Sequence, residues 1–272
     1  MAGLLKNLEK LKIQILLFGA ILLILSSAGC QKSVSAPGPS VDAGDEKLSA
    51  EKVLQAEPLY DGREDMAKAR VAVATLRQAR IADYGNYEAA WRLARAAYYV
   101  GDHTDSSTES DDMFREGIEA GKAAVKLQPN KPEGHFWLGA NYGGSAAHST
   151  LASLANVQDI RKEMEAVLKI DQGYQAGSAF TVLGRLYLQA PRVLGGDTGK
   201  AISYLEKGLS FGANNSLTRV YLAEAYAAAN RDSDARKQIE ALETMTPDPK
   251  FLPEHKDALA KAKKLQERMS AR

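Results

Sequence analysis

Leu138-Gly139-Ala140-Asn141-Tyr142 is the stretch that decides the fold, because its pattern recurs along the chain. The same order of Leu, a small residue and Tyr returns at residues 183–187 and 222–226, and a weaker copy at residues 94–98 follows Trp91. A Leu and a Tyr four residues apart lie on one face of a helix, and the small residue beside the Leu lets a second helix approach closely. The pattern therefore predicts closely packed helices.

A second helical segment follows each copy and ends near a proline or a turn residue: Pro129, Asp171, Ala213 and Pro247. A helix, a turn and a second helix, repeated in this way, are typical of the tetratricopeptide repeat. We therefore expect an all-α fold, an α-solenoid of degenerate tetratricopeptide-like helix pairs with a capping C-terminal helix. Such a fold usually binds other molecules and rarely catalyses a reaction.

The distance between the two helices of a pair is longer than the plain repeat requires. In the last pair Tyr226 and Ala235 are 9 residues apart, whereas the equivalent separations upstream are 19, 17 and 14 residues. The excess predicts long intra-repeat loops along one edge of the array, and insertions on one face often form a binding rim. The alternative is that surface loops tolerate added length without any function.

Charge and motif content argue against several classes of function. The 35 Lys and Arg residues balance 34 Asp and Glu residues, so no overall field favours nucleic acid. The stretch Gly195-Gly196-Asp197-Thr198-Gly199-Lys200 fails as a phosphate loop, because Leu194 replaces its first glycine and Ala201 its Ser or Thr. Paired histidines and a nucleophile elbow are also missing from the sequence. We expect no enzyme activity, no cofactor and no metal site.

The N-terminus is typical of an export signal. Lys6, Lys10 and Lys12 precede an uncharged stretch at residues 13–29, which ends at Cys30, the single cysteine of the chain. A Cys directly after Gly at the end of an apolar run resembles a bacterial lipobox, in which the Cys is lipidated and becomes the new N-terminus. The alternatives are an uncleaved membrane anchor, or cleavage without lipid.

These features predict three parts of the chain: a lipoprotein signal peptide at 1–29, a flexible tether at 30–45, and a solenoid domain at 46–272. The tether is rich in Ser, Ala, Pro and Gly and has no apolar periodicity. In bacterial lipoproteins Gln31, rather than Asp, after the lipidated Cys generally implies the outer membrane. The expected location is therefore the periplasmic face of a bacterial membrane, with the outer membrane favoured.

Helical periodicity in the folded part begins near Leu48, is interrupted by Pro58 and resumes at Gly62. The starting points expected for the helices of the four pairs are Asn86 and Asp111, Lys131 and Asn156, Tyr174 and Thr198, and Asn215 and Asp232. Three helix N-termini have expected caps: Asp197 or Thr198, Asn215, and Asp232. Residues 252–269 are expected to form a charged helix whose narrow apolar face covers the last repeat.

The first helix of each pair is expected to line the inner, concave face of the solenoid. Aligning the repeats places six candidate ligand- or partner-binding residues on this face: Arg92, Tyr99, Phe136, Thr181, Arg185 and Glu224. Two arginines beside aromatic rings can hold a carboxylate over an apolar floor. The alternative is that both arginines are simply solvated on an exposed helix face.

The stretches Trp91-Arg92-Leu93-Ala94-Arg95-Ala96 and Ala190-Pro191-Arg192-Val193-Leu194-Gly195-Gly196-Asp197 resemble the TatT family. Its members are lipoprotein T components associated with tripartite ATP-independent periplasmic (TRAP) transporters. The resemblance covers about residues 84–247, and the loop that carries Pro191, Gly195, Gly196 and Asp197 is its most specific part. It implies a helical solenoid, trimeric with a pore in at least one member, that meets the solute-binding P component.

Together these features predict a membrane-anchored, non-enzymatic periplasmic lipoprotein. It would bind a protein partner, such as a periplasmic solute-binding protein, and an acidic small ligand, as a TRAP-associated T component; a homo-oligomer is also compatible with the resemblance. The alternative is a structural envelope scaffold that bridges proteins and binds no solute. No nucleic-acid partner is expected.

Overall fold

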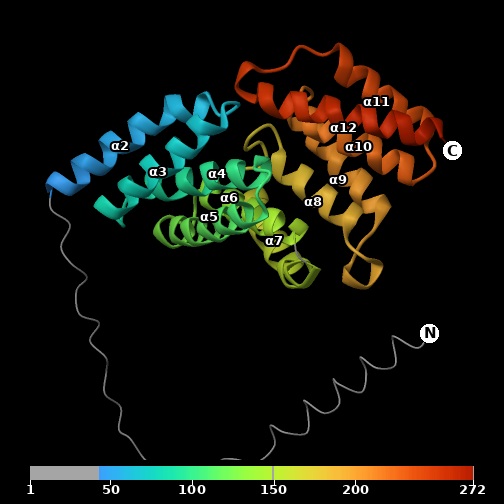
Figure 1. The fold of residues 1–272 in the computed structure, drawn as a ribbon. Helices are drawn as coiled ribbons and strands as arrows, with labels where there is room; N and C mark the ends of the chain where they lie inside the picture. The colour runs from blue at the N-terminus through green and yellow to red at the C-terminus, as the bar shows by residue number, and fades with distance from the viewer. Residues whose placement is uncertain (1–42, 149, 272) are drawn as a thin grey trace, which may run out of the picture. The chain divides into compact units, whose positions relative to one another are not determined.

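The computed structural model describes residues 43–148 and 150–271, and over those residues the chain is helical and contains no strand (Figure 1). The described helices form five successive pairs and one final helix: α2 (Ala43–Asp61) with α3 (Met66–Ala82), α4 (Tyr87–His103) with α5 (Ser107–Leu127), α6 (Pro132–His148) with α7 (Thr150–Ile170), α8 (Ser178–Gln189) with α9 (Thr198–Phe211), α10 (Ser216–Ala228) with α11 (Asp232–Thr244), and α12 (Leu252–Ser270). Each pair packs against the next. The all-α class and the α-solenoid of helix pairs are confirmed.

The small residues of the repeated pattern lie where paired helices touch, as the sequence predicts. A Cβ atom added to Gly139 on α6 would collide with the end of Met164 and lie 3.3 Å from Cβ of Glu163, both on α7. A Cβ on Gly184 of α8 would lie 2.5 Å from Cγ of Leu205 on α9. The leucine before each small residue is fully or almost fully buried. Glycine at these positions therefore sets the spacing of the helices.

Polar side chains fix where several helices begin. Asp65, Asn86, Asp197 and Asn215 each accept a hydrogen bond from a backbone N–H in the first turn of the following helix. The caps expected at Asp197 and Asn215 are confirmed. The cap expected at Asp232 is wrong, because this residue is already the first residue of α11.

The long loops predicted inside the first two repeats are wrong. α4 runs to His103 and α5 begins at Ser107, while α6 runs to His148 and α7 begins at Thr150. The extra residues lengthen the helices, because a helix satisfies its own backbone hydrogen bonds and these extensions also pack. The buried ring of Phe114 lies against Gly101 and Gly144, where an added Cβ would clash with it. Only the third repeat keeps a long connection, at residues 190–197.

The interruption expected at Pro58 is also wrong, because α2 continues through this residue to Asp61. Proline removes one helical hydrogen bond and leaves the carbonyl four residues earlier without its partner. Here that carbonyl belongs to Leu54, and both Leu54 and Pro58 are exposed, so water can replace the lost bond. α2 also ends one turn after Pro58, which limits the loss of helix stability that the proline causes.

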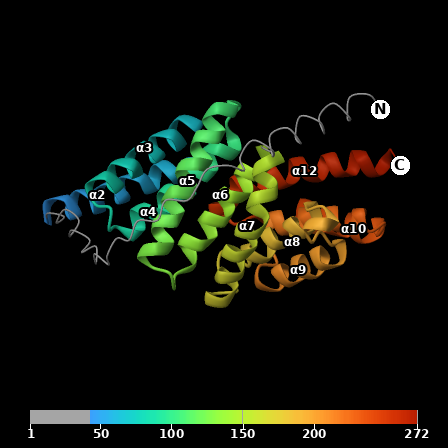
Figure 2. The same cartoon turned by 90° about the horizontal axis from the view of Figure 1, so that it is seen from below.

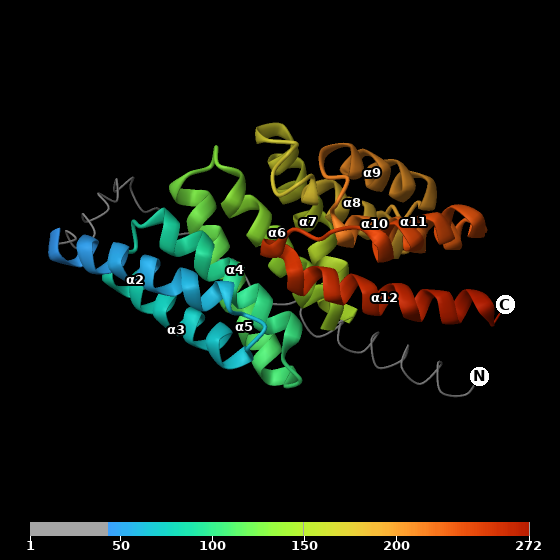
Figure 3. The ribbon, with the colours of Figure 1, turned by 90° about the horizontal axis from the view of Figure 1, so that it is seen from above.

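The core consists of two groups of buried side chains. One extends from α2 to α8, and the other from α9 to α12. α12 packs on α10 and α11 through Ala258, Ala262, Leu265 and Met269, and Figure 3 shows it running beside α10. Its other face is charged and exposed, as expected for a terminal helix that covers the last repeat.

Several predictions concern residues outside the described part of the chain. These are the signal peptide at 1–29, the lipidation of Cys30, and the tether up to residue 42. The solenoid begins at Ala43, slightly before the predicted start at 46. Among the described helices, none combines the length and the apolar character needed to cross a membrane.

A buried ion pair joins α6 to α7. Nδ1 of His135 lies 2.5 Å from Oε2 of Glu163, and Nε2 lies 2.9 Å from the carbonyl oxygen of Pro129. Because both ring nitrogens face acceptors, the doubly protonated imidazolium fits best. The hydrogen bond to Glu163 raises the pKa of His135, although burial opposes its charge. Burial alone would raise the pKa of Glu163, but the bonds from His135 and Lys162 hold it below the usual value.

The first prediction tests the helix contact at Gly139. Replacing Gly139 with Leu should destabilise the fold by about 1–3 kcal/mol, because the new side chain meets Met164 and Glu163. Gly143→Ala on the same helix is the matched control: its Cβ meets nothing within 4 Å, so it should stabilise by about 0.5–1 kcal/mol. Urea unfolding measures both. Equal effects of the two changes would contradict the packing described here.

The second prediction concerns pH. The pKa of His135 is higher in the folded state than in the unfolded state, so its contribution to stability is complete below about pH 6.5 and is lost as the pH rises through the folded pKa. Glu163 behaves in the opposite way, and its contribution is lost as the pH falls below about 4.3. Urea melts from pH 5 to 9 should show the decline in the parent.

Glu163→Gln is the comparison for this pH series. It removes the carboxylate that raises the pKa of His135, so the part of the decline caused by this pair should disappear. His103 also has a raised pKa, and the difference between the two proteins separates the His135 contribution from it. Identical pH profiles would show that the buried pair does not couple to folding.

Candidate functional site on the inner helices

The first helices of successive pairs are neighbours: α2 contacts α4, α4 contacts α6, and α8 contacts α10. Figure 2, turned by 90° from Figure 1, shows α8, α9 and α10 grouped together. All six predicted site residues lie on these first helices, on α4, α6, α8 and α10. The structure divides them between different local environments.

Arg92 on α4 is not solvated on an open groove, because two carboxylates hold it. It forms ion pairs with Glu57 of α2 and with Glu88 one turn earlier. Arg95, three residues on, donates to the same oxygen of Glu57 at 2.7 Å. The side chains of Arg92 and Arg95 are only 21% and 15% exposed, so the contact is half-buried. We call Arg92 and Arg95 the arginine pair.

Arg185 on α8 differs, because within the described residues no hydrogen bond or ion pair joins it to a carboxylate. Its guanidinium lies 4.9 Å from the ring centre of Tyr221 on α10. Burial would lower its pKa, but the surroundings, including Tyr98, Asp102 and Glu224, keep its pKa raised. Its Nε atom is buried without a hydrogen-bond partner. The guanidinium of Arg185 is therefore positioned beside Tyr221, and at least its Nε–H has no hydrogen-bond acceptor in the described residues.

Three of the predicted site residues are packed inside the protein. Tyr99 is 6% exposed and stacks on His103 with ring centres 4.0 Å apart. Phe136 is also 6% exposed and packs edge-on against Tyr174 at 5.4 Å. Thr181 is buried between α8 and α10, where its hydroxyl meets that of Thr218 at 2.5 Å. These side chains shape the inner helices and present little free surface.

Glu224 on α10 faces the C-terminal helix. It forms an ion pair with Arg268 of α12 at 3.6 Å, and its side chain is 24% exposed. It also contributes to the electrostatic environment of Arg185. Glu224 therefore links the Arg185 region to α12.

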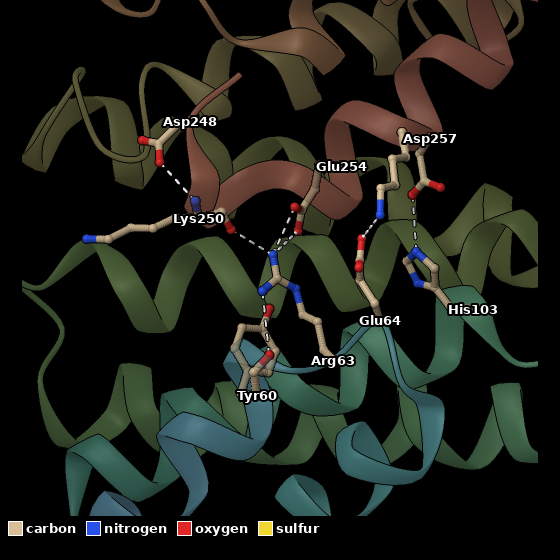
Figure 4. Close-up of polar contacts among 9 residues, drawn as sticks. Tyr60, Arg63, Glu64, His103, Asp248, Lys250, Glu254 and Asp257 are labelled. Carbon is tan, nitrogen blue, oxygen red and sulfur yellow. Dashed lines mark hydrogen bonds and ion pairs between the residues drawn. The ribbon is translucent and has the colours of Figure 1, made fainter. Parts of the chain in front are cut away.

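The start of α12 is tied to the N-terminal helices by contacts that we call the α12 latch: Arg63–Glu254, Glu64–Lys256 and His103–Asp257 (Figure 4). Arg63, which is 5% exposed, donates to both oxygens of Glu254 and to the carbonyl oxygen of Lys250, each at 2.9 Å. It also lies 4.8 Å from the ring centre of Tyr60. The latch joins residues that are 154 to 192 positions apart in the sequence.

His103 completes the latch at the end of α4. Nδ1 meets the carbonyl oxygen of Tyr99 at 2.9 Å and Nε2 meets Oδ2 of Asp257 at 3.1 Å. Burial lowers its pKa, but the bonds to Asp257 and Tyr99 outweigh this and raise it. The raised pKa therefore favours the charged form of His103 beside the carboxylate of Asp257.

The loop at residues 190–197 is held by its own backbone. Gly195 has φ +89°, which favours glycine, and a Cβ on Gly196 would collide with the carbonyl oxygen of Ala190. The carbonyl oxygen of Pro191 accepts from Gly196 N–H at 3.1 Å, and Asp197 caps α9. The motif residues thus build the loop, while Val193 at its tip is 92% exposed.

Sequence reasoning missed the residues that complete these contacts: Glu57, Tyr60, Arg63 and Arg95. The sequence could have indicated Arg95, because it lies three residues after Arg92 and so shares its side of the helix. The other three lie on the first pair, which carries no copy of the repeated pattern. Within the described residues no group of three or more His, Cys, Asp or Glu side chains is arranged to hold a metal ion.

The third prediction tests the latch. Glu254→Ala leaves Arg63 buried without its carboxylate and should lower the free energy of unfolding by roughly 1.5–3 kcal/mol. Lys256→Ala breaks the neighbouring Glu64 pair, whose side chains are about half exposed, and should cost less than about 1 kcal/mol. Urea unfolding of both variants gives the comparison. A larger loss for Lys256→Ala would show that the buried contact does not hold α12.

Solved structures with the same fold are tetratricopeptide-type proteins. TTC0263, a thermophilic TPR protein of Thermus thermophilus, has a TM-score of 0.57 at 19% identity, covering 78% of this chain and 99% of its own. PilF of Pseudomonas aeruginosa has a TM-score of 0.52 at 16% identity, covering 83% and 93%. MamA from Desulfovibrio magneticus RS-1 has a TM-score of 0.50 at 14% identity, covering 75% and 96%. At these identities the likeness shows the fold alone.

Among curated proteins, none matches the sequence significantly. The family model described as TAtT, TRAP transporter T-component, matches residues 78–271. The matched segment runs from the end of α3 to the end of α12 and includes Arg92, Arg185 and the loop at 190–197. This is well over half of the sequence, so the chain belongs to the TRAP transporter T-component family.

Proposed function

We propose that this protein is a lipid-anchored T component that works beside a TRAP transporter, binding the transporter's periplasmic solute-binding protein and an acidic solute without catalysis. The observation that carries the proposal is the family match, which covers four helix pairs and the C-terminal helix. A solenoid of helix pairs offers long surfaces suited to binding a protein. The anchor would be Cys30, on the periplasmic face of a bacterial membrane, with the outer membrane favoured.

Arg185 supports the acidic-solute part of the proposal. Of the two arginines that the sequence selects, Arg92 already bonds two carboxylates, whereas Arg185 has none as a hydrogen-bond partner in the described part of the chain. A guanidinium with a spare donor beside an aromatic ring suits a carboxylate carried on an apolar body. Tyr221 would supply that apolar contact.

The exposed loop favours a second candidate function, the envelope scaffold. Val193 is 92% exposed on a short turn whose shape is fixed by Gly195 and Gly196. A rigid turn that presents an apolar side chain suits contact with another protein. A scaffold would use this surface and would have no need of Arg185.

The fourth prediction separates these functions. Replacing residues 192–197 by a short Gly/Ser turn should abolish capture of the solute-binding protein in crosslinked membranes. Arg185→Ala should weaken binding of a small dicarboxylate such as succinate by roughly 10- to 150-fold, the effect of losing one charge-assisted hydrogen bond. Arg236→Ala, an exposed arginine on α11, is the matched control and should change neither.

Cys30→Ser provides the anchoring arm of the same experiment, because it should lose incorporation of a palmitate analogue. Equal incorporation in parent and variant would contradict the lipid anchor. Loss of capture only with the loop change, and no succinate binding in any protein, would leave the scaffold alone. Capture of no transporter component by the parent would refute the association.

A further inference from the structure

The arginine pair is arranged as a carboxylate site that already has an occupant. Arg92 and Arg95 lie one turn apart on α4 and both donate to the same oxygen, Oε1 of Glu57. Two guanidinium groups offer far more donors than one oxygen can use. Nε of Arg95 is buried and has no hydrogen-bond partner in the described residues. Glu57 therefore leaves at least one N–H group of the arginine pair without an acceptor.

Aromatic rings flank both guanidinium groups. The centre of the Arg95 guanidinium lies 3.9 Å from the ring centre of Tyr60 and 5.0 Å from that of Trp91. The Arg92 guanidinium lies 4.4 Å from the Trp91 ring. Stacking on aromatic faces fixes the planes of the guanidinium groups, which lowers the entropy lost when they bind a carboxylate.

A strained turn connects α7 to α8, directly after Tyr174. Gln175, Ala176 and Gly177, between α7 and α8, have φ values of 45°, 56° and 75°, although only one of them is glycine. Asn215 holds the turn by donating to the carbonyl oxygen of Ala176 at 3.3 Å. The turn places Tyr174 against Phe136, within electrostatic range of Arg95. Strained backbone of this kind persists where the surrounding structure requires one geometry, often at binding sites.

We propose that Arg92 and Arg95 bind the carboxylate of a small, planar organic acid, and that Glu57 is a built-in competitor for this site. The proposal does not rest on the association with a transporter. The side chains of Arg92 and Arg95 are largely buried, at 21% and 15% exposure, which suits a small acid. The neighbouring Tyr60 and Trp91 rings suit a planar apolar body.

Glu57 is suited to the role of competitor because of where it lies. It is on α2, which precedes the segment matched by the family model, whereas the arginine pair lies inside that segment. Its side chain is 32% exposed, so it can turn towards water when a ligand arrives. Because it is tethered, it competes at a high effective concentration and weakens the binding of every free carboxylate.

The fifth prediction compares the parent protein with Glu57→Gln. Benzoate is the probe, and its neutral analogue benzamide is the control for stacking alone. Glu57→Gln should bind benzoate roughly 10- to 150-fold more tightly than the parent, the gain expected when one charge-assisted contact is freed. Benzamide binding should not change. Calorimetry gives the affinities, and fluorescence in a Trp137→Phe background, where Trp91 is the single tryptophan, reports on the site itself.

Three further variants define the site. Glu88→Gln removes the same charge but bonds Arg92 and Trp91 and not Arg95, so it should give a much smaller gain. Adding Arg95→Gln to Glu57→Gln should remove the gain. Adding Arg185→Gln instead should leave it intact, which separates this site from the proposed succinate site.

Thermal melts establish that each variant is folded. Glu57→Asp keeps the charge but is one methylene shorter, and it should give an intermediate gain in benzoate affinity; it provides the test if Glu57→Gln is unstable. The proposal is overturned if the folded Glu57 variants bind benzoate no better than the parent. It is also overturned if Glu88→Gln gives an equal gain, or if the gain survives loss of Arg95.

Discussion

The close approach of paired helices is the constraint on which the rest of this structure depends. Gly121 of α5 lies so near α6, the first helix of the next pair, that a Cβ there would be 2.9 Å from the Cα of Leu138, while Gly139 and Gly184 make room for Met164 and Leu205 of the helices paired with theirs. Without side chains between them, the backbones pack at short range and bury the adjacent leucines. The spacing of the helices therefore determines where the side chains of the inner face lie.

The two ends of the solenoid are held in different ways. Successive pairs stack through apolar side chains, whereas α12 reaches back to α2 and α4 through charged contacts, with Arg63 and Glu254 at the centre. Burying an arginine is costly unless its charge is compensated, and here Nη2 of Arg63 bonds both oxygens of Glu254 and a carbonyl, while its buried Nε has no partner in the described residues. The latch therefore specifies where α12 lies more than it adds to stability.

The inner helices show how neighbouring charges decide which groups remain able to bind. Arg92 and Arg185 both lie on first helices, α4 and α8, yet Arg92 faces Glu57 and Glu88 while Arg185 packs against Tyr221. The difference comes from what packs opposite each helix: α2 supplies a carboxylate, and α10 supplies an aromatic ring. Two arginines on first helices thus have different chemical surroundings.

The sequence by itself determined the helix-pair fold, the small residues at helix contacts, and the caps at Asp197 and Asn215, because these depend on spacing within one or two turns. It did not determine that the extra residues of the first two repeats extend helices, since this requires Phe114 to be covered from both sides. The partners of Arg92 and the α12 latch were likewise decided by tertiary structure. Glu57 lies 35 residues from Arg92, and Glu254 lies 191 from Arg63, so only packing of whole helices brings these charges together.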